Sequence, residues 1–114
     1  MPRKILIVDD DVDTLRLVGM MLETEGFEIV AAKTGKRSIE LARSETPDLI
    51  ILDVMMPELD GYAVTSQLRT DQDTRGIPIL IFTAKTGHDD KMLGLELGAD
   101  IYLTKPISTR ELLS

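Results

Sequence analysis

The chain has no cysteine and only one histidine among its 114 residues. The lack of cysteine excludes disulfide frameworks, thiolate zinc sites and cysteine nucleophiles. With His88 alone, a multi-histidine metal site is excluded, and Ser-His-Asp catalysis would depend entirely on this residue. A bound metal would therefore need oxygen ligands. A reducing, cytoplasmic location fits the missing cysteine.

Positive charge is also scarce, because 13 Lys and Arg residues stand against 20 Asp and Glu residues, for a formal net charge of -7. This sign is wrong for a domain that coats nucleic acid or anionic lipid, so we expect no direct nucleic-acid contact. The first apolar run, residues 5–8, is far shorter than a signal-peptide core or a span of about 20 residues, so no membrane segment is expected. With 43% hydrophobic residues, the 114-residue chain suits one folded domain.

Short apolar runs alternate with segments of helical periodicity. The runs predict five strands, at residues 5–8, 27–32, 49–52, 78–82 and 101–103. The periodic segments predict helices that end before Gly26, begin at Thr34-Gly35, and cover residues 62–69 and 89–97, with residues 70–76 as a surface connection. This alternation is typical of βαβ units and of a parallel sheet covered by helices on both faces.

A capping-box pattern, Ser108-Thr109-Arg110-Glu111, predicts one more helix close to the end of the chain. Only about one helical turn would follow it before Ser114, whereas helices that cover a sheet usually run to about 11 residues. We therefore expect a truncated last helix, in a chain cut from a longer one or lacking the end of that helix.

Chemically useful side chains follow four of the five predicted strands. Asp9 and Asp10 follow the first strand, Asp53 follows the third, Thr83 follows the fourth, and Thr104-Lys105 follows the fifth. Ligands of open α/β sheets bind outside these carboxyl ends, so residues far apart in sequence are expected to meet in one cleft.

Three carboxylates in one cleft repel each other unless a cation lies among them. Because thiolate and histidine ligands are missing, a hard cation is expected, with Mg²⁺ the first choice. Mg²⁺ usually shares its site with phosphate oxygens, which Lys105 and Thr83 are suited to bind. Phosphoryl transfer is the chemistry that this set fits, and one carboxylate is a candidate nucleophile.

With these residues in place, the chain resembles the receiver domain of two-component response regulators over essentially its whole length. Four segments in order carry the resemblance: Lys4–Asp10, Asp53–Gly61, Thr83-Ala84 and Gly98–Pro106. It implies that residues 1–114 form a receiver domain with a flavodoxin-like α/β fold, a five-stranded parallel sheet of order 2-1-3-4-5.

Roles for single residues also follow from the resemblance. Asp53 would be the phosphoacceptor and the modified residue, and Mg²⁺ would be bound by Asp10, Asp53 and the Met55 carbonyl, with Asp9 acting through water. Lys105 would contact the phosphoryl group, Thr83 would move toward it, and Tyr102 would swing inward. This switch would alter the face formed by the fourth helix, the fifth strand and the last helix.

The implied function is a phosphorylation-activated switch rather than an ordinary enzyme. Its donor would be a sensor histidine kinase or a phosphotransfer protein. An output domain, a separate protein or a second copy would dock on the switched face.

Two other classes remain as alternatives. A Mg²⁺-dependent phosphatase of the haloacid dehalogenase type also forms an aspartyl-phosphate, but it needs a general acid two residues after the nucleophile, where this chain has Met55. A receiver-like interaction module that is never phosphorylated would have no need for clustered carboxylates. Nucleotide hydrolysis lacks its phosphate-binding loop.

Structural interpretations also compete with the functional ones. Asp53, Asp9 and Asp10 would then be loop or capping carboxylates. Lys105 would be a solvated strand-end lysine, Thr83 a residue that favours strands, and Tyr102 a partly buried aromatic with its hydroxyl in water. We expect Asp11 and Asp13 to act mainly as helix-start residues. His88 is expected to be an exposed residue at the start of a helix, with no functional role. The basic residues Lys33, Lys36 and Arg37 are expected on a solvated helix surface.

Overall fold

The computed structural model describes residues 3–105. Its five parallel strands form one sheet of order β2-β1-β3-β4-β5. The strands are β1 (Lys4–Val8), β2 (Glu28–Ala32), β3 (Leu49–Leu52), β4 (Ile79–Thr83) and β5 (Ile101–Thr104). The helices are α1 (Val12–Thr24), α2 (Gly35–Glu45), α3 (Gly61–Thr70) and α4 (His88–Glu96). The fold class and strand order expected from the sequence are confirmed.

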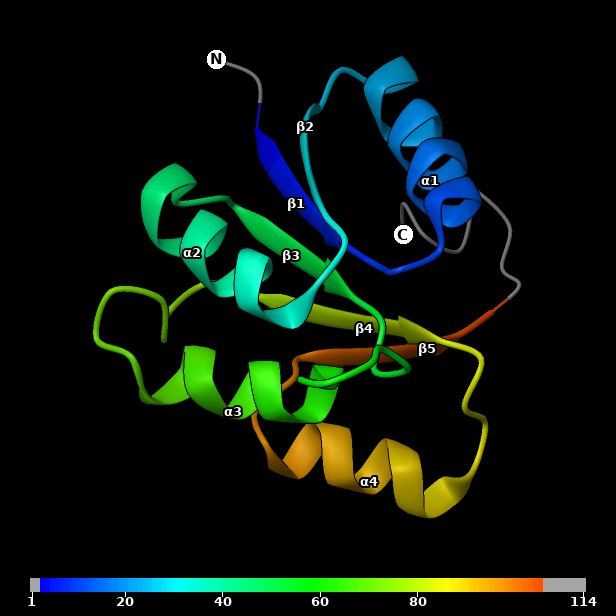
Figure 1. The fold of residues 1–114 in the computed structure, drawn as a ribbon, viewed down its shortest axis with the longest axis vertical. Coiled ribbons are helices and arrows are strands. Elements are labelled where there is room, and N and C mark those ends of the chain that lie inside the picture. Colours follow the sequence, from blue (N-terminus) through cyan, green and yellow to red (C-terminus); the bar gives the residue numbers. More distant parts are fainter. Residues whose placement is uncertain (1–2, 106–114) are drawn as a thin grey trace.

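Helices cover both faces of the sheet, as Figure 1 shows for α1 on one side and α2, α3 and α4 on the other. Alternation along each strand divides the core accordingly. Leu6, Val8 and Leu52 pack with α2 and α3, whereas Ile7 and Ile51 pack with α1. The near-continuous apolar strands of the sequence are therefore explained by burial on both faces.

Local side-chain caps set most helix starts. Asp11, Thr34 and Asp60 precede α1, α2 and α3, and each accepts a hydrogen bond from a backbone N–H in the first turn. Gly26 and Gly98 follow the ends of α1 and α4 with positive φ angles of 96° and 116°, as expected for residues that terminate helices. The predicted helix boundaries hold to within one or two residues.

The prediction that residues 70–76 form a surface connection is wrong in part. Thr70 still belongs to α3, and Thr74 is fully buried. Its hydroxyl donates a 2.7 Å hydrogen bond to the carbonyl of Leu68, which lies in the last turn of α3 and has no partner within the helix. The polar composition of the segment concealed this inward-pointing threonine. The predicted capping box at residues 108–111 lies outside the described residues.

Candidate functional site at the carboxyl edge of the sheet

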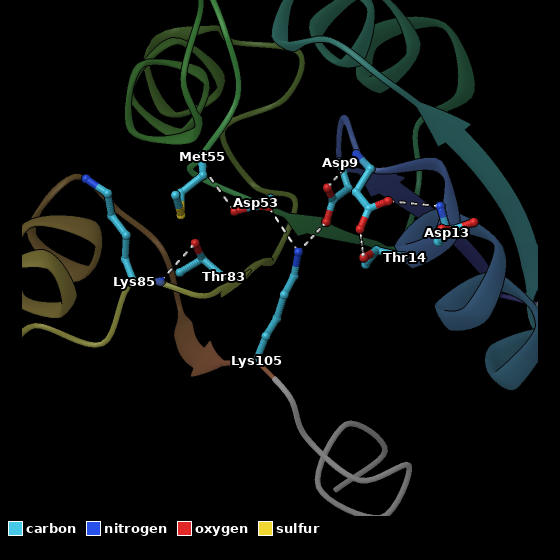
Figure 2. A network of polar contacts seen from close by, with 9 residues as sticks. Asp9, Asp13, Thr14, Asp53, Met55, Thr83, Lys85 and Lys105 are labelled. Atoms are coloured by element: carbon cyan, nitrogen blue, oxygen red, sulfur yellow. Dashed lines mark hydrogen bonds and ion pairs between the residues drawn. The ribbon is translucent and has the colours of Figure 1, made fainter.

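The carboxyl ends of β1 and β3 lie side by side, which brings Asp9 and Asp53 together. The amide N–H of Asp53 donates to the carbonyl of Val8 at 2.9 Å, which extends the pairing of the two strands by one residue. At the other side, the amide N–H of Lys105 donates to the carbonyl of Thr83 at 2.7 Å. Figure 2 shows the Lys105 side chain reaching from this position to the space between the two carboxylates.

Three carboxylates form the acidic centre of the site. One oxygen each from Asp9, Asp10 and Asp53 lies within 4.8 Å of the others. Asp9 and Asp53 are buried, with 2% and 6% of their surface exposed, whereas Asp10 faces solvent. Two carboxylates therefore form the floor of the site and the third stands at its opening.

Lys105 bridges the two buried carboxylates. Its Nζ lies 2.6 Å from Oδ2 of Asp9 and 3.0 Å from Oδ2 of Asp53. Burial raises the pKa of Asp9, and the hydrogen bond from Lys105 only partly opposes this effect. Burial also acts to lower the pKa of Lys105, but its hydrogen bonds to Asp9 and Asp53 outweigh that and leave the pKa raised. Lys105 is thus held in its charged form between two anions.

The same pattern orients both buried carboxylates. Oδ1 of Asp9 accepts the amide N–H of Asp11 at 2.9 Å, and Oδ1 of Asp53 accepts the amide N–H of Met55 at 3.0 Å. Each carboxylate therefore has one oxygen on a backbone amide two residues later and the other on Lys105. Both carboxylates are therefore held in fixed orientations before any ligand binds. Such preorganisation is what electrostatic stabilisation of a reacting group requires.

The segment after Asp53 packs tightly against the start of α3. A β-carbon at Gly61 would lie 2.5 Å from the carbonyl oxygen of Asp53 and from Cα of Val54. Only glycine permits this approach, since such contacts are far inside van der Waals distance. Asp-Gly is a common turn dipeptide, but only the structure shows that Gly61 is needed by the backbone that carries Asp53.

Thr83 and Tyr102 hold the backbone of Lys85 from opposite sides. Thr83 is fully buried and its Oγ1 accepts the amide N–H of Lys85 at 3.4 Å. The hydroxyl of Tyr102 donates to the carbonyl of Lys85 at 3.1 Å. Among the described residues, neither side chain hydrogen-bonds to the carboxylates, and both bond to the segment that follows β4.

Tyr102 already lies inside the fold, with 6% of its surface exposed. This is the position that the sequence-based interpretation expects after phosphorylation. Sequence reasoning gave no role to Tyr62, whose hydroxyl lies 3.4 Å from that of Tyr102. The signal available in the sequence was that these are the only two tyrosines in the chain.

The remaining polar candidates have the structural roles expected of them. Asp11 caps α1, and Asp13 lies in its first turn. His88 begins α4 and is exposed. The basic residues at the start of α2 and before it are also exposed: Lys33, Lys36 and Arg37.

Comparison with known proteins identifies the family. A model of the family described as "Response regulator receiver domain" matches residues 5–114. The chain belongs to this family. As a receiver domain of a two-component response regulator, it is a signalling phosphoacceptor rather than an enzyme in the ordinary sense, which removes the phosphatase alternative.

Relatives of this receiver domain include longer transcriptional regulators. It is 50% identical over 111 residues to the alkaline phosphatase synthesis transcriptional regulatory protein PhoP of Bacillus subtilis, covering 97% of this chain and 45% of that protein. It is 44% identical over 110 residues to the probable transcriptional regulator ycf27 of Cyanophora paradoxa, covering 96% of this chain and 45% of that protein. The chain thus spans slightly less than half the length of these relatives.

Solved receiver structures superimpose on the whole fold. The chemotaxis protein CheY4 of Vibrio cholerae matches with a TM-score of 0.93 and 31% identity, covering 99% of this chain and 94% of that one. A response regulator from Chloroflexus aurantiacus matches with a TM-score of 0.94 and 34% identity, covering 99% and 93%. None of the helices described between residues 3 and 105 is long and apolar enough to cross a membrane.

Proposed function

We propose that this receiver domain accepts a phosphoryl group on Asp53 from a phosphohistidine of a sensor histidine kinase or phosphotransfer protein. An oxygen of Asp53 attacks the phosphorus, the bond from phosphorus to the histidine nitrogen breaks, and the imidazole leaves. The observation that carries the proposal is the buried pair Asp9 and Asp53, bridged by Lys105 and joined by Asp10 at the opening.

The donor set fits Mg²⁺. Three carboxylates converge within 4.8 Å, and such oxygens are what this hard cation prefers. We assign its direct binding to Asp10, Asp53 and the backbone carbonyl of Met55, with Asp9 acting through a bound water. When bound, Mg²⁺ supplies positive charge that offsets the carboxylates and the oxygens of an incoming phosphoryl group.

Lys105 has the position needed to bind the new phosphoryl group. Its Nζ is already 3.0 Å from Asp53, and its hydrogen bonds to Asp9 and Asp53 outweigh the effect of burial and keep its pKa raised. An ammonium aimed at the reacting oxygens stabilises charge that grows as the phosphoryl group transfers. In this role Lys105 exchanges part of its contact with the carboxylates for contact with the phosphoryl oxygens.

A phosphoryl group on Asp53 would change the hydrogen bonds available to Thr83. The group carries about -1.5 to -2 charges and three strong acceptor oxygens. If the Thr83 hydroxyl turns to one of them, the amide of Lys85 loses its 3.4 Å contact. Tyr102 holds the carbonyl of the same residue, so the change reaches β5 through one short segment.

The output face is proposed to be α4 and β5, together with the last helix expected from the sequence. Exposed apolar side chains gather on the two described elements, with 44% of Met92, 42% of Leu93 and 49% of Ile101 exposed. An output domain, a partner protein or a second copy of the chain would dock there. Light scattering with and without beryllofluoride, a phosphoryl mimic, tests for the second copy.

We assign the reaction to the cytoplasm.

Intact-mass spectrometry after incubation with acetyl phosphate and Mg²⁺ tests the acceptor. The protein is expected to gain one acid-stable, base-labile phosphoryl group, and to gain none without Mg²⁺ or in Asp53→Asn. Asp60→Asn is the matched control, because it makes the same change seven residues away and asparagine caps a helix as well as aspartate. Undiminished phosphorylation of Asp53→Asn contradicts the assignment.

A further inference from the structure

Two tyrosine hydroxyls meet where α3, α4 and β5 come together. Tyr62, in the first turn of α3, places its hydroxyl 3.4 Å from that of Tyr102 in β5. The Tyr62 hydroxyl also lies 3.1 Å from the carbonyl oxygen of Asp90 in α4. The Tyr102 hydroxyl lies 3.1 Å from the carbonyl oxygen of Lys85. The pair thus connects three elements and the segment between β4 and α4.

Counting protons shows that these contacts are interdependent. Two hydroxyl groups carry two protons, whereas the three contacts would need three. If both protons point to the carbonyls, the two hydroxyl oxygens face each other without a hydrogen between them. In either of the other arrangements one tyrosine donates a hydrogen bond to the other, and the accepting hydroxyl donates its own hydrogen bond to the carbonyl of Lys85 or of Asp90. Such chained hydrogen bonds strengthen one another, so each tyrosine affects the contact made by the other.

The ring of Tyr102 packs closely against Gly94 in α4. A β-carbon at Gly94 in α4 would lie 3.0 Å from Cδ2 of the Tyr102 ring and 3.0 Å from Ile81. The ring therefore fits between α4 and the sheet with its hydroxyl emerging beside Tyr62. The ring of Tyr62 is only partly buried, and Lys85 Nζ stands 5.9 Å from its centre. Tyr62 is therefore the more accessible member of the pair.

We infer that Tyr62 is a positioning residue of the switch, whose hydroxyl holds Tyr102 in its inward position and so couples α3 to the backbone of Lys85. The inference deepens the proposed function and rests on it, because the position of Tyr102 transmits a signal only if Asp53 is phosphorylated. Tyr62 makes no hydrogen bond to the carboxylates among the described residues, so Asp53 should still accept a phosphoryl group in Tyr62→Phe.

Nuclear magnetic resonance of protein with ¹³C-labelled tyrosine rings tests the inference, since the chain has two tyrosines and no tryptophan. Tyr62→Phe and Tyr102→Phe assign the two sets of ring signals. A soluble paramagnetic agent then reports how far the Tyr102 ring is exposed. In Tyr62→Phe we expect the ratio of outward to inward Tyr102 to rise roughly fivefold, the change for loss of one neutral hydrogen bond.

Asp90→Ala is the matched control. It removes the carboxylate that lies 3.8 Å from Lys85 Nζ but keeps the backbone carbonyl that faces Tyr62. The exposure of Tyr102 should stay as in the unchanged protein. Equal exposure of Tyr102 in Tyr62→Phe and the unchanged protein overturns the inference, because the hydroxyl of Tyr62 would then hold nothing in place.

A double-variant cycle gives a second and independent readout. Urea unfolding of the two single phenylalanine variants and of the double variant should reveal a coupling of roughly fivefold in the unfolding equilibrium. Zero coupling refutes the inference even if Tyr62→Phe lowers stability. The acetyl phosphate reaction distinguishes failure of the proposed function from failure of the inference about Tyr62. We expect a normal phosphoryl adduct in Tyr62→Phe. If the unchanged protein forms no adduct, the proposed function is wrong, but the resonance test of Tyr62 remains valid.

Discussion

Replacing Lys105 by methionine removes a cation from between two buried carboxylates while keeping an unbranched side chain. Among residues 3–105, Lys105 is the one basic group paired with Asp9 and Asp53. Without it, both carboxylates stay buried beside each other and beside Asp10 with no compensating charge. The substitution therefore tests whether electrostatics or packing holds the site together.

The expected loss is large for a single substitution. Removing one partner of a buried ion pair costs about 3–5 kcal/mol, because the other charge remains without compensation. The lower end applies here, since 21% of the Lys105 side chain is exposed, against 3% and 7% for Asp9 and Asp53. A loss of about 3 kcal/mol, at about 4 °C per kcal/mol for a domain of this size, lowers the unfolding midpoint by about 12 °C.

Added Mg²⁺ should reverse part of this loss. A ligand that binds only the folded state adds about 1.4 kcal/mol at ten times its dissociation constant. We expect a larger stabilisation by Mg²⁺ in Lys105→Met than in the unchanged protein, because the competing ammonium is gone. Urea unfolding at neutral pH, with and without millimolar Mg²⁺, measures both effects.

Lys36→Met is the control for the loss of one positive charge. Lys36 is exposed in the first turn of α2, and surface charges contribute about 0–1 kcal/mol at most. If Lys105→Met loses no more stability than Lys36→Met, or if Mg²⁺ stabilises it no more than the unchanged protein, the electrostatic reasoning is wrong.

Three further predictions follow from single contacts. Gly61→Ala should destabilise the fold by about 3 kcal/mol, because the new β-carbon would lie 2.5 Å from the Asp53 backbone. The control Gly76→Ala should not destabilise it, since a β-carbon there meets nothing within 4 Å. Thermal unfolding compares the two variants. Asp60→Ala should cost about 1 kcal/mol through loss of its 2.9 Å cap on the Ala63 amide, as urea unfolding will show. Burial, and to a smaller extent the hydrogen bond with the Tyr102 hydroxyl, raises the pKa of Tyr62. The free energy of unfolding should therefore keep its full value below about pH 10 and fall above it. An absorbance titration of Tyr102→Phe, in which Tyr62 is the only tyrosine, should have a midpoint above about 10, and a midpoint at or below that value would show that Tyr62 is not shielded.

The order of the elements could be predicted from the sequence because it depends on local patterns. The unbroken apolar run at residues 49–52 and the capping residues Asp11, Thr34 and Asp60 can be recognised from a few neighbouring residues. The gathering of Asp9 and Asp53 at one edge also follows from sequence, since parallel strands with right-handed crossovers end on the same side.

Burial within that edge was decided by the tertiary structure. Asp9 and Asp10 are neighbours of the same type, yet one is buried and the other faces solvent. Both residues follow β1, and the elements that pack around the end of this strand decide which of the two side chains is buried. The inward Thr74 escaped prediction because the way the chain turns back after α3 decides which residue of the polar segment reaches the carbonyl of Leu68.

Contacts between distant residues required the fold itself. Lys105 reaches Asp9 across 96 positions of sequence, and the tyrosine hydroxyls meet across 40. Residue type tells which chemistry a side chain offers, and strand order tells at which edge it lies. Distances of 2.6 Å or 3.4 Å depend on how helices and strands pack together, because shifts of an ångström make or break a hydrogen bond. The sequence by itself therefore determined the elements and the acidic set, and the tertiary structure decided which carboxylates Lys105 bridges and where the two tyrosines meet.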